Sequence, residues 1–386
     1  MDIKATKNIF ELKTPAFVID EKRLIENGRI IKEISDQTGA RFLLAQKAFS
    51  GYDLYPVISE YAYGTEASGL FEARLGHEEM PKKECHVFCA AYKEEDIDEI
   101  CRYADHIVFN SPTQLKAFGK KAKRAGLSIG LRINPECSTQ EGHGIYDPCA
   151  PGSRLGTTRD QFDKLMTAED IELLDGIHFH TLCEQGAEPL KLTVDAVKKG
   201  FGDILPKMKW INLGGGHHVS KPDYNRDLLA DIINDLKTAY DAEIYLEPGE
   251  AFAIDAGYLV TTVLDITENN GTKNVIVDMS AACHSPDILE VPFTPPLVEA
   301  VEDGAYKYRF GGPTCLAGDV IGDYAFDHEL SIGEKLTFGD MAMYSMVKTN
   351  TFNGMPLPDI YVLHADDSIE RLTHFGYEDF KKRLGS

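Results

Sequence analysis

The sequence predicts an α/β barrel of eight strand–helix units, followed by a smaller all-β domain. Eight short apolar runs, each bounded by turn residues, recur over the first two thirds of the 386-residue chain. Segments with apolar residues at three- and four-residue steps lie between these runs, and after residue 252 strand-like runs dominate. Short buried strands that alternate with amphipathic helices are typical of a parallel (β/α)8 barrel of the TIM type.

Each of the eight runs has the length and composition of a strand buried on both faces. The early runs begin about 22 residues apart, which leaves room for a helix after each strand. In order, the runs are RFLLAQK (41–47), AYGTEAS (62–68), CHVFCAA (85–91), HIVFN (106–110), SIGLRIN (128–134), GIHFHTL (176–182), WINLGGG (210–216) and EIYLEPG (243–249).

Helical periodicity is clearest in four of the intervening segments. The segment SPTQLKAFGKKAKRAG begins with Ser-Pro, a helix start signal, and its periodicity stops before Gly126. The four predicted helices cover residues 68–76, 93–104, 111–126 and 225–241. This alternation completes the barrel pattern.

We expect the barrel to cover residues 16–252, and the second domain to cover residues 253–386 together with residues 1–15. The strand-like runs LVTTVLDITE, KNVIVDMS, YKYRFGG, EKLTFGD and DIYVLHAD support an all-β second domain. The early segment PAFVID is a candidate to pair with it. Residues 135–159 form a long interval after the fifth strand, and long loops in compact domains are often functional.

Composition excludes several classes of protein. With 62 acidic and 40 basic residues the net charge is −22, and such a surface repels phosphate backbones, so we expect no nucleic-acid partner. The charge is compatible with a cationic substrate, although an acidic soluble surface explains it more simply. No apolar run is long enough to span a membrane. The first segment, MDIKATKNIFELK, has no apolar stretch of the length found in signal peptides. We therefore expect a cytoplasmic protein that binds no membrane.

The eight cysteines are too sparse for a disulfide scaffold and are expected to be reduced thiols. Cys85 and Cys89, with His86 between them, could indicate a metal site. They lie in an apolar run, however, and no second ligand pair has the spacing of a zinc site. A buried strand explains this run better, and we expect no metal.

Candidate reactive residues lie where the predicted strands end, which is where barrels carry their chemistry. Lys47 ends the first run, and apolar neighbours lower the pKa of an amine and suit it to imine formation. Taken alone, such a lysine is more often a solvated charge. Gly214, Gly215 and Gly216 end the seventh run and would let backbone N–H groups approach an anion, although a tight turn would also explain them.

A histidine pair and a glutamate complete this set. His178 and His180 share one face of the sixth strand, where they could bind a metal or stack on a flat cofactor. Glu247 ends the eighth strand and needs a cationic or protonated partner if it is buried. The predicted barrel mouth thus combines a lysine, a histidine, three glycines and a glutamate. This combination suits the binding of pyridoxal 5'-phosphate (PLP).

Six motifs in order along the chain resemble the fold type III PLP-dependent decarboxylases, the alanine-racemase-like group that includes ornithine and diaminopimelate decarboxylases. Within this group they are most similar to the branch that acts on carboxynorspermidine and carboxyspermidine. The motifs are HFHTLCE (178–184), NLGGGHH (212–218), EPGEA (247–251), ACHSPDILEVPFTPPL (282–297), GPTCLAGD (312–319) and MAMYSMVKTNTFNG (341–354).

The resemblance implies roles for individual residues. Lys47 matches the lysine that binds PLP, His180 the histidine that stacks on the pyridine ring, and Glu247 the glutamate that pairs with the pyridine nitrogen. Gly214, Gly215 and Gly216 match the phosphate loop. The other implied positions are Glu72 and Arg154 near the cofactor, Tyr344 near phosphate and substrate, and Cys315, which in relatives reaches the active site of the partner subunit of a homodimer.

One departure from the group bears on the substrate. Relatives that act on diaminopimelate or ornithine usually have Glu-Pro-Gly-Arg after the eighth strand, whereas here Glu250 replaces the arginine. An arginine would bind a carboxylate, but a glutamate attracts an ammonium. Asp287 lies in the region that selects the distal end of the substrate, although it could instead cap a following helix. Two acids suit a substrate with secondary and terminal amines.

The implied activity is decarboxylation of carboxynorspermidine or carboxyspermidine to norspermidine or spermidine. The nearest alternative is a diaminopimelate- or ornithine-type decarboxylase, which Glu250 disfavours. An alternative of another class is a non-catalytic PLP-binding regulator. Such proteins typically lose the lysine or the partner cysteine, and this chain has both Lys47 and Cys315.

Overall fold

The computed structural model describes residues 7–140, 144–291 and 293–385. The chain divides into two compact units. One unit is Ile25–Phe252, and the other combines the chain up to Leu24 with the chain from Ala253 onwards. The first boundary between the two units thus follows Leu24, whereas we expected it between residues 15 and 16. It lies later because the first strand belongs to the sheet of the second unit.

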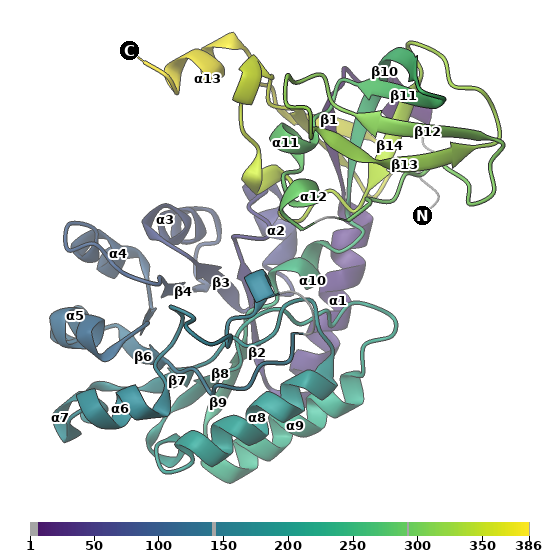
Figure 1. The fold of residues 1–386 in the computed structure, drawn as a ribbon. Helices are drawn as coiled ribbons and strands as arrows, with labels where there is room; N and C mark the ends of the chain where they lie inside the picture. The colour runs from purple at the N-terminus through teal and green to yellow at the C-terminus, as the bar shows by residue number, and fades with distance from the viewer. Residues whose placement is uncertain (1–6, 141–143, 292, 386) are drawn as a thin grey trace. The chain divides into compact units, whose positions relative to one another are not determined.

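Eight parallel strands close into a barrel in the first unit, so the predicted fold class is confirmed (Figure 1). Each strand falls within one of the eight apolar runs, or begins one residue before it. The strands are β2 (Arg41–Ala45), β3 (Gly64–Ala67), β4 (Glu84–Phe88), β5 (His106–Phe109), β6 (Ser128–Arg132), β7 (Gly176–His178), β8 (Trp210–Asn212) and β9 (Glu243–Leu246).

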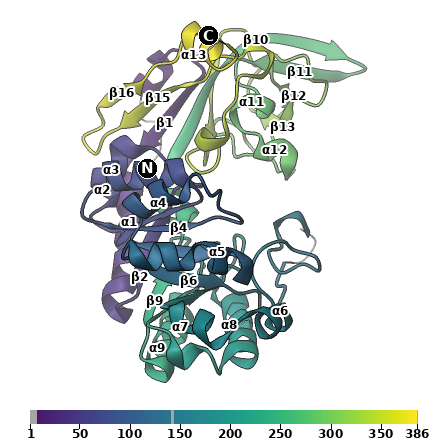
Figure 2. The ribbon, with the colours of Figure 1, turned by 90° about the vertical axis from the view of Figure 1, so that its left-hand side faces the viewer.

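Helices surround these strands (Figure 2). Two of the predicted helix starts have side-chain caps: Ser111 accepts the backbone N–H of Gln114, and Asn225 accepts that of Leu228. The helices are α1 (Glu21–Thr38), α2 (Tyr55–Ile58), α3 (Leu70–Glu79), α4 (Ile97–Tyr103), α5 (Pro112–Arg124), α6 (Arg159–Leu165), α7 (Ala168–Leu173), α8 (Ala187–Phe201), α9 (Arg226–Tyr240) and α10 (Gly249–Ala253).

The lower interior of the barrel is filled by Trp210, the first residue of β8. A Cβ atom at Gly130 would lie 2.4 Å from the indole ring, and one at Gly176 would lie 2.0 Å from it, so only glycine fits at these positions. The indole Nε1 donates a hydrogen bond to Ser128 Oγ at 2.8 Å. Side-chain layers of this kind make the barrel a packed core rather than a pore.

The second unit is built on an eight-stranded sheet in the described part of the chain. β1 pairs antiparallel with β10 and parallel with β15, so the segment PAFVID does pair with the second domain. The elements are β1 (Ala16–Asp20), β10 (Gly257–Asn269), β11 (Thr272–Val277), α11 (Ala281–His284), α12 (Asp287–Glu290), β12 (Tyr306–Gly311), β13 (Val320–Phe326), β14 (Lys335–Gly339), β15 (Asp359–Leu363), β16 (Ile369–Thr373) and α13 (Tyr377–Lys382).

Aromatic side chains form much of the core of this second unit. Phe310, Phe326 and Phe338 are fully buried, and the Phe310 ring contacts both of the others. Bulky rings of this kind account for a large part of the apolar area that folding buries. In neither unit do the described residues include a helix long and apolar enough to cross a bilayer.

Candidate active site

The carboxyl ends of the barrel strands place charged and polar side chains together in the mouth of the barrel. Lys47 lies two residues after β2, and its ammonium is close enough to act on the pKa values of Glu66, Glu247 and His180. Glu66 lies in β3, and Glu247 follows β9. Three residues on three different parts of the sequence thus surround the lysine, as expected for a site at the top of a parallel barrel.

Glu247 is buried and anionic. Its Oε2 lies 3.0 Å from His178 Nε2, and its Oε1 accepts a 2.7 Å hydrogen bond from Asn212 Nδ2. Burial by itself favours the neutral acid, but the contact with His178 and the charge of Lys47 outweigh it and lower the pKa of Glu247 to about 2. Burial also lowers the pKa of His178, so a neutral imidazole donates its Nε2 proton to the carboxylate.

His180 is held in one orientation and one protonation state. Its Nδ1 accepts the backbone N–H of Gly215 at 3.1 Å, and its carbonyl accepts a 3.0 Å hydrogen bond from Arg132 Nη2. Burial, followed by the charges of Lys47 and Arg132, lowers the pKa of His180 well below its usual value. The ring is therefore neutral, and its proton sits on Nε2.

The glycine loop after β8 has no room for side chains. Gly214 and Gly216 have φ angles of +74° and +79°, which non-glycine residues rarely adopt. A Cβ atom at Gly214 would lie 2.5 Å from the Phe179 carbonyl oxygen, and one at Gly215 would lie 2.6 Å from that of Glu247. The loop therefore brings bare backbone to the mouth, as an anion site requires. The N–H groups of Gly214 and Gly215 are already donated to Asn212 Oδ1 and His180 Nδ1, which leaves that of Gly216 for an anion.

Glu66 was not among the residues singled out from the sequence. Its side chain is buried, and Oε2 has no hydrogen-bond partner among the described residues. Burial raises the pKa of Glu66 to about 8, with Lys47 and Arg132 opposing the shift and Glu247 and Glu72 adding to it. A charged residue inside a strand predicted to be buried on both faces was the available signal.

Arg132, rather than Arg154, is the buried arginine of this site. Arg132 ends β6, its guanidinium lies 4.6 Å over the Phe88 ring, and it is close enough to affect the pKa of Glu66. Burial lowers the pKa of Arg132 to about 10, which leaves it charged at neutral pH. Arg154 is exposed on the long loop, where its carbonyl accepts a hydrogen bond from Asn110. The charge of Arg154 nevertheless adds to the lowering of the Arg132 pKa, so Arg154 lies near the barrel mouth, and its placement close to the cofactor stays a prediction.

Glu72 and Glu250 already have partners within the barrel unit. Glu72 Oε2 accepts the backbone N–H of Ser68 at 2.6 Å, at the start of α3. Glu250 Oε2 lies 2.6 Å from His218 Nε2. Glu250 is therefore not an isolated negative charge, and a substrate ammonium would join an existing hydrogen bond.

Asp287 and Tyr344 lie together in the second unit, around Lys348. The Lys348 ammonium contacts Asp287, lies 2.8 Å from Glu290 Oε2, and lies 5.8 Å from the centre of the Tyr344 ring. Asp287 makes no side-chain capping hydrogen bond in α12, where Pro286 is the N-cap, so the capping alternative is wrong. Tyr344 has a φ of +54°, which is uncommon for an aromatic residue. Backbone conformations of this kind occur more often at functional sites.

Cys315 is exposed and is anchored by its backbone. Its N–H donates a 2.6 Å hydrogen bond to Asn353 Oδ1. In the same segment, Asp319 Oδ1 accepts a 3.2 Å hydrogen bond from the backbone N–H of Ala282. Three of the six sequence motifs, distant along the chain, thus meet on the second unit.

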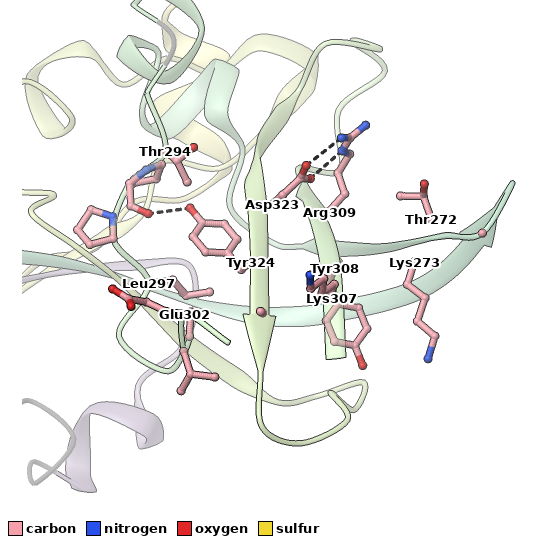
Figure 3. Close-up of a pocket in the computed structure, with 16 residues that line it drawn as sticks. Thr272, Lys273, Thr294, Leu297, Glu302, Lys307, Tyr308, Arg309, Asp323 and Tyr324 are labelled. Atoms are coloured by element: carbon pink, nitrogen blue, oxygen red, sulfur yellow. Dashed lines mark hydrogen bonds and ion pairs between the residues drawn. The ribbon is translucent and has the colours of Figure 1, made fainter. Parts of the chain in front are cut away.

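A separate groove of about 1080 Å³ lies on the second unit, between β11–β13 and the segment 294–302 (Figure 3). Tyr324 in this groove donates a 2.7 Å hydrogen bond to the Pro295 carbonyl, and Arg309 pairs with Asp323. None of the site residues predicted from the sequence lines it. The groove is therefore not part of the candidate site.

The residues of the barrel mouth fit PLP. The bare glycine loop suits a phosphate, the neutral His180 ring suits a flat aromatic partner, and the anionic Glu247 suits a protonated ring nitrogen. Lys47 supplies the primary amine. These four features occur on one unit of the chain and do not depend on how the two units are placed.

Comparison with known proteins gives the same family. Residues 16–342 match the family described as pyridoxal-dependent decarboxylase, C-terminal sheet domain. The chain is 36% identical to carboxynorspermidine/carboxyspermidine decarboxylase of Campylobacter jejuni, over 97% of this chain and 99% of that protein. It is also 36% identical to carboxyaminopropylagmatine decarboxylase of Synechocystis sp., over 100% of this chain and 99% of that protein.

A solved structure matches over nearly the whole chain. It is the crystal structure of carboxynorspermidine decarboxylase from Campylobacter jejuni complexed with norspermidine. The TM-score is 0.87 at 36% identity, and the match covers 96% of this chain and 100% of that one. Fold, motif order and sequence identity agree, and the chain belongs to the pyridoxal-dependent decarboxylase family.

Proposed function

We propose that the protein decarboxylates carboxynorspermidine or carboxyspermidine and releases norspermidine or spermidine. The observation that carries this proposal is the full-length match to the Campylobacter jejuni enzyme, at 36% identity and a TM-score of 0.87. The acidic residue at position 250 supports it, because an arginine there would favour a substrate with a distal carboxylate. Glu250 remains close to its histidine partner and is nearly buried, so it can strengthen binding of a substrate amine.

PLP, when bound, supplies an electrophilic carbonyl and an electron sink for the bond that breaks. Lys47 is the proposed anchor of this carbonyl through its Nζ. Glu247, held anionic by its contacts with His178 and Asn212, would keep a proton on the ring nitrogen. His180 would orient the ring by stacking on it. The Gly216 N–H would hold the phosphate, because those of Gly214 and Gly215 are donated to Asn212 Oδ1 and His180 Nδ1.

Loss of carbon dioxide leaves the α carbon of the substrate in need of a proton. The Cys315 thiol and the Lys47 ammonium are the proposed donors. Cys315 is exposed on its own subunit, in keeping with a role at the active site of a second copy in a homodimer. We propose that the protein is located in the cytoplasm, because all eight cysteines are free thiols.

Steady-state kinetics on a panel of substrates tests the proposal. The panel contains carboxynorspermidine, carboxyspermidine, carboxyaminopropylagmatine, diaminopimelate and ornithine. We expect the highest kcat/KM for one of the first two substrates. These two differ by one methylene, and an enzyme commonly discriminates such a pair by only about 1–3 kcal/mol. The third substrate is included because the Synechocystis relative is equally identical to this chain. A preference for diaminopimelate or ornithine would overturn the proposal, and cofactor binding without turnover on any of the five would favour a regulator.

A further inference from the structure

Three metal-binding side chains meet at the opposite end of the barrel from the PLP site. Glu84 and His86 lie in β4, and His106 is the first residue of β5. His86 and His106 are register partners on these two neighbouring parallel strands. The cluster is therefore at the amino-terminal end of the strands, whereas Lys47 and Glu247 are at the carboxyl end.

The ligand atoms of this cluster are close to metal-binding geometry. Glu84 Oε2 lies 2.9 Å from His86 Nε2 and 3.9 Å from His106 Nε2, and one ligand atom of each residue lies within 4.8 Å of the other two. Tetrahedral zinc with bonds of about 2.0–2.1 Å needs ligand atoms about 3.3 Å apart. The two distances lie on either side of this value. Because the two rings are stacked with an interplanar angle of 13°, one ring must turn before both lone pairs can point at one ion.

The Nε2 atom of each imidazole is on the side of Glu84. Their rings stack with centroids 3.9 Å apart, and neither Nδ1 has a hydrogen-bond partner among the described residues. No protein acceptor therefore fixes the proton of either ring, which can move to Nδ1 and leave the Nε2 lone pair facing Glu84.

The charges around the cluster leave room for a cation. Arg41 lies 3.7 Å from the other carboxylate oxygen of Glu84, but its guanidinium already forms a two-pronged ion pair with Glu243 at 2.5 Å. Glu84, Glu243 and Arg41 together carry one net negative charge. Tyr245 OH donates a 3.0 Å hydrogen bond to Glu84 Oε2, which orients the carboxylate as outer-sphere partners of metal ligands do.

The geometry points to a divalent transition-metal site formed by Glu84, His86 and His106 at the amino-terminal end of the barrel. Two imidazoles and one carboxylate suit Zn²⁺ and exclude Mg²⁺ and Ca²⁺, which prefer oxygen ligands. Glu84 is about a quarter exposed and His86 is buried, so solvent reaches the site from one side and water can complete the coordination. The neighbouring thiols are not part of it, because Cys85 Sγ and Cys89 Sγ donate to the backbone carbonyls of Ala73 and Ser68.

Calorimetric titration of the untagged, PLP-loaded, chelator-treated protein with Zn²⁺ tests this inference. We expect one ion per chain at this site and a raised thermal midpoint. Glu84→Gln and His106→Gln should each weaken binding by more than about tenfold, since even outer-sphere partners commonly contribute that much. Glu84→Gln changes a partly exposed side chain and keeps its shape, so it remains informative if His106→Gln does not fold.

His328→Gln is the matched control. His328 also contacts two carboxylates, Asp327 and Glu334, at 2.7 and 2.8 Å, but it is half exposed and has no second histidine. This variant should bind Zn²⁺ as the unchanged protein does. Anomalous diffraction from zinc-soaked crystals should give a peak bonded to His86 and His106. The inference is overturned if no ion binds, if Glu84→Gln binds zinc with unchanged affinity, or if the only peaks lie on cysteine sulfurs.

Discussion

Glu250 Oε2 lies 2.6 Å from His218 Nε2, and both side chains are almost completely buried. The histidine supplies one hydrogen bond to the carboxylate and leaves its remaining lone pairs for a second donor. A substrate ammonium would be a charge-assisted second donor, and such hydrogen bonds are shorter and stronger than neutral ones. The residue that replaces the arginine of diaminopimelate-type relatives is thus oriented before substrate binds.

Glu250→Gln should lower kcat/KM for carboxynorspermidine. The loss should correspond to about 1–3 kcal/mol of transition-state stabilisation, the usual contribution of a hydrogen bond to a charged group. The loss should be smaller for diaminopimelate, whose distal carboxylate gains nothing from this acid. Kinetics on both substrates measures the difference, with the visible absorbance of bound PLP as a check on the cofactor. Equal losses on the two substrates, or loss of PLP, would show that Glu250 has a structural role only.

Lys47→Ala should leave no measurable turnover and remove the visible absorbance band of lysine-bound PLP. The reason is that Lys47 is the lysine that acts electrostatically on Glu247, Glu66 and His180 in the barrel mouth. Lys93→Ala, which changes an exposed lysine paired with Glu95, is the control and should keep both properties. Decarboxylation by Lys47→Ala would refute the assignment.

Arg132→Met should be far more harmful than Arg154→Gln. Arg132 is buried near Glu66 and Glu247, and removing one partner of buried charges commonly costs about 3–5 kcal/mol. Arg154 is exposed, and surface changes usually stay within about 0.5 kcal/mol. Thermal unfolding and kcat/KM of the two variants should be compared, with Arg132→Lys as an intermediate that keeps the charge but loses the planar stacking on Phe88. Similar behaviour of Arg132→Met and Arg154→Gln would contradict the placement.

Cys315→Ala should lower kcat strongly and leave PLP affinity nearly unchanged, because the thiol is proposed to act after carbon dioxide leaves. The side chain is exposed, so its removal should have little effect on the thermal midpoint. Mixing this variant with Lys47→Ala tests the dimer. Half of the randomly formed dimers are mixed and have one intact site of two, so about a quarter of full activity should return. A normal kcat, or no recovery on mixing, would contradict these roles.

Glu66 predicts a pH dependence of stability. Its pKa is raised to about 8 from an ordinary 4.5, so between these values the unfolded chain releases a proton that the folded chain keeps. Stability should therefore fall as pH rises through this window, by at most about 1.4 kcal/mol per pH unit. Glu66→Gln has no such proton. Its gain in thermal midpoint over the unchanged protein should grow as the pH rises through the window from 4.5 to about 8. A gain independent of pH would mean that Glu66 is not buried as a neutral acid.

The barrel strands were predictable because each is a short apolar run between turn residues. In the second unit, β13 and β16 were missed. β13 (VIGDYAF) carries a glycine and an aspartate, and β16 (IERLT) is an edge strand whose charged residues face solvent. An edge strand can have one face buried, or neither. Such strands therefore lack the hydrophobic pattern that identifies central strands.

The site was predicted less completely than the fold. Lys47, His180, the glycine loop and Glu247 were found because they end strands, where barrels place their chemistry. Glu66 and Arg132 also lie in predicted strands, but their apolar neighbours led us to treat those runs as core. Arg154 was named from the family resemblance, and nothing in a single sequence shows whether a loop arginine points into the mouth or into solvent. The partner of Glu250 was equally hidden, because His218 lies 32 residues earlier in sequence.

Trp210 is the only tryptophan of the chain, and it sits inside the barrel against Gly130 and Gly176. Its fluorescence therefore reports on one of the two units and is silent about the other. Circular dichroism, by contrast, reports on both. If the two signals change at the same denaturant concentration, the barrel and the sheet domain unfold as one cooperative unit, and separate midpoints would show that each folds independently.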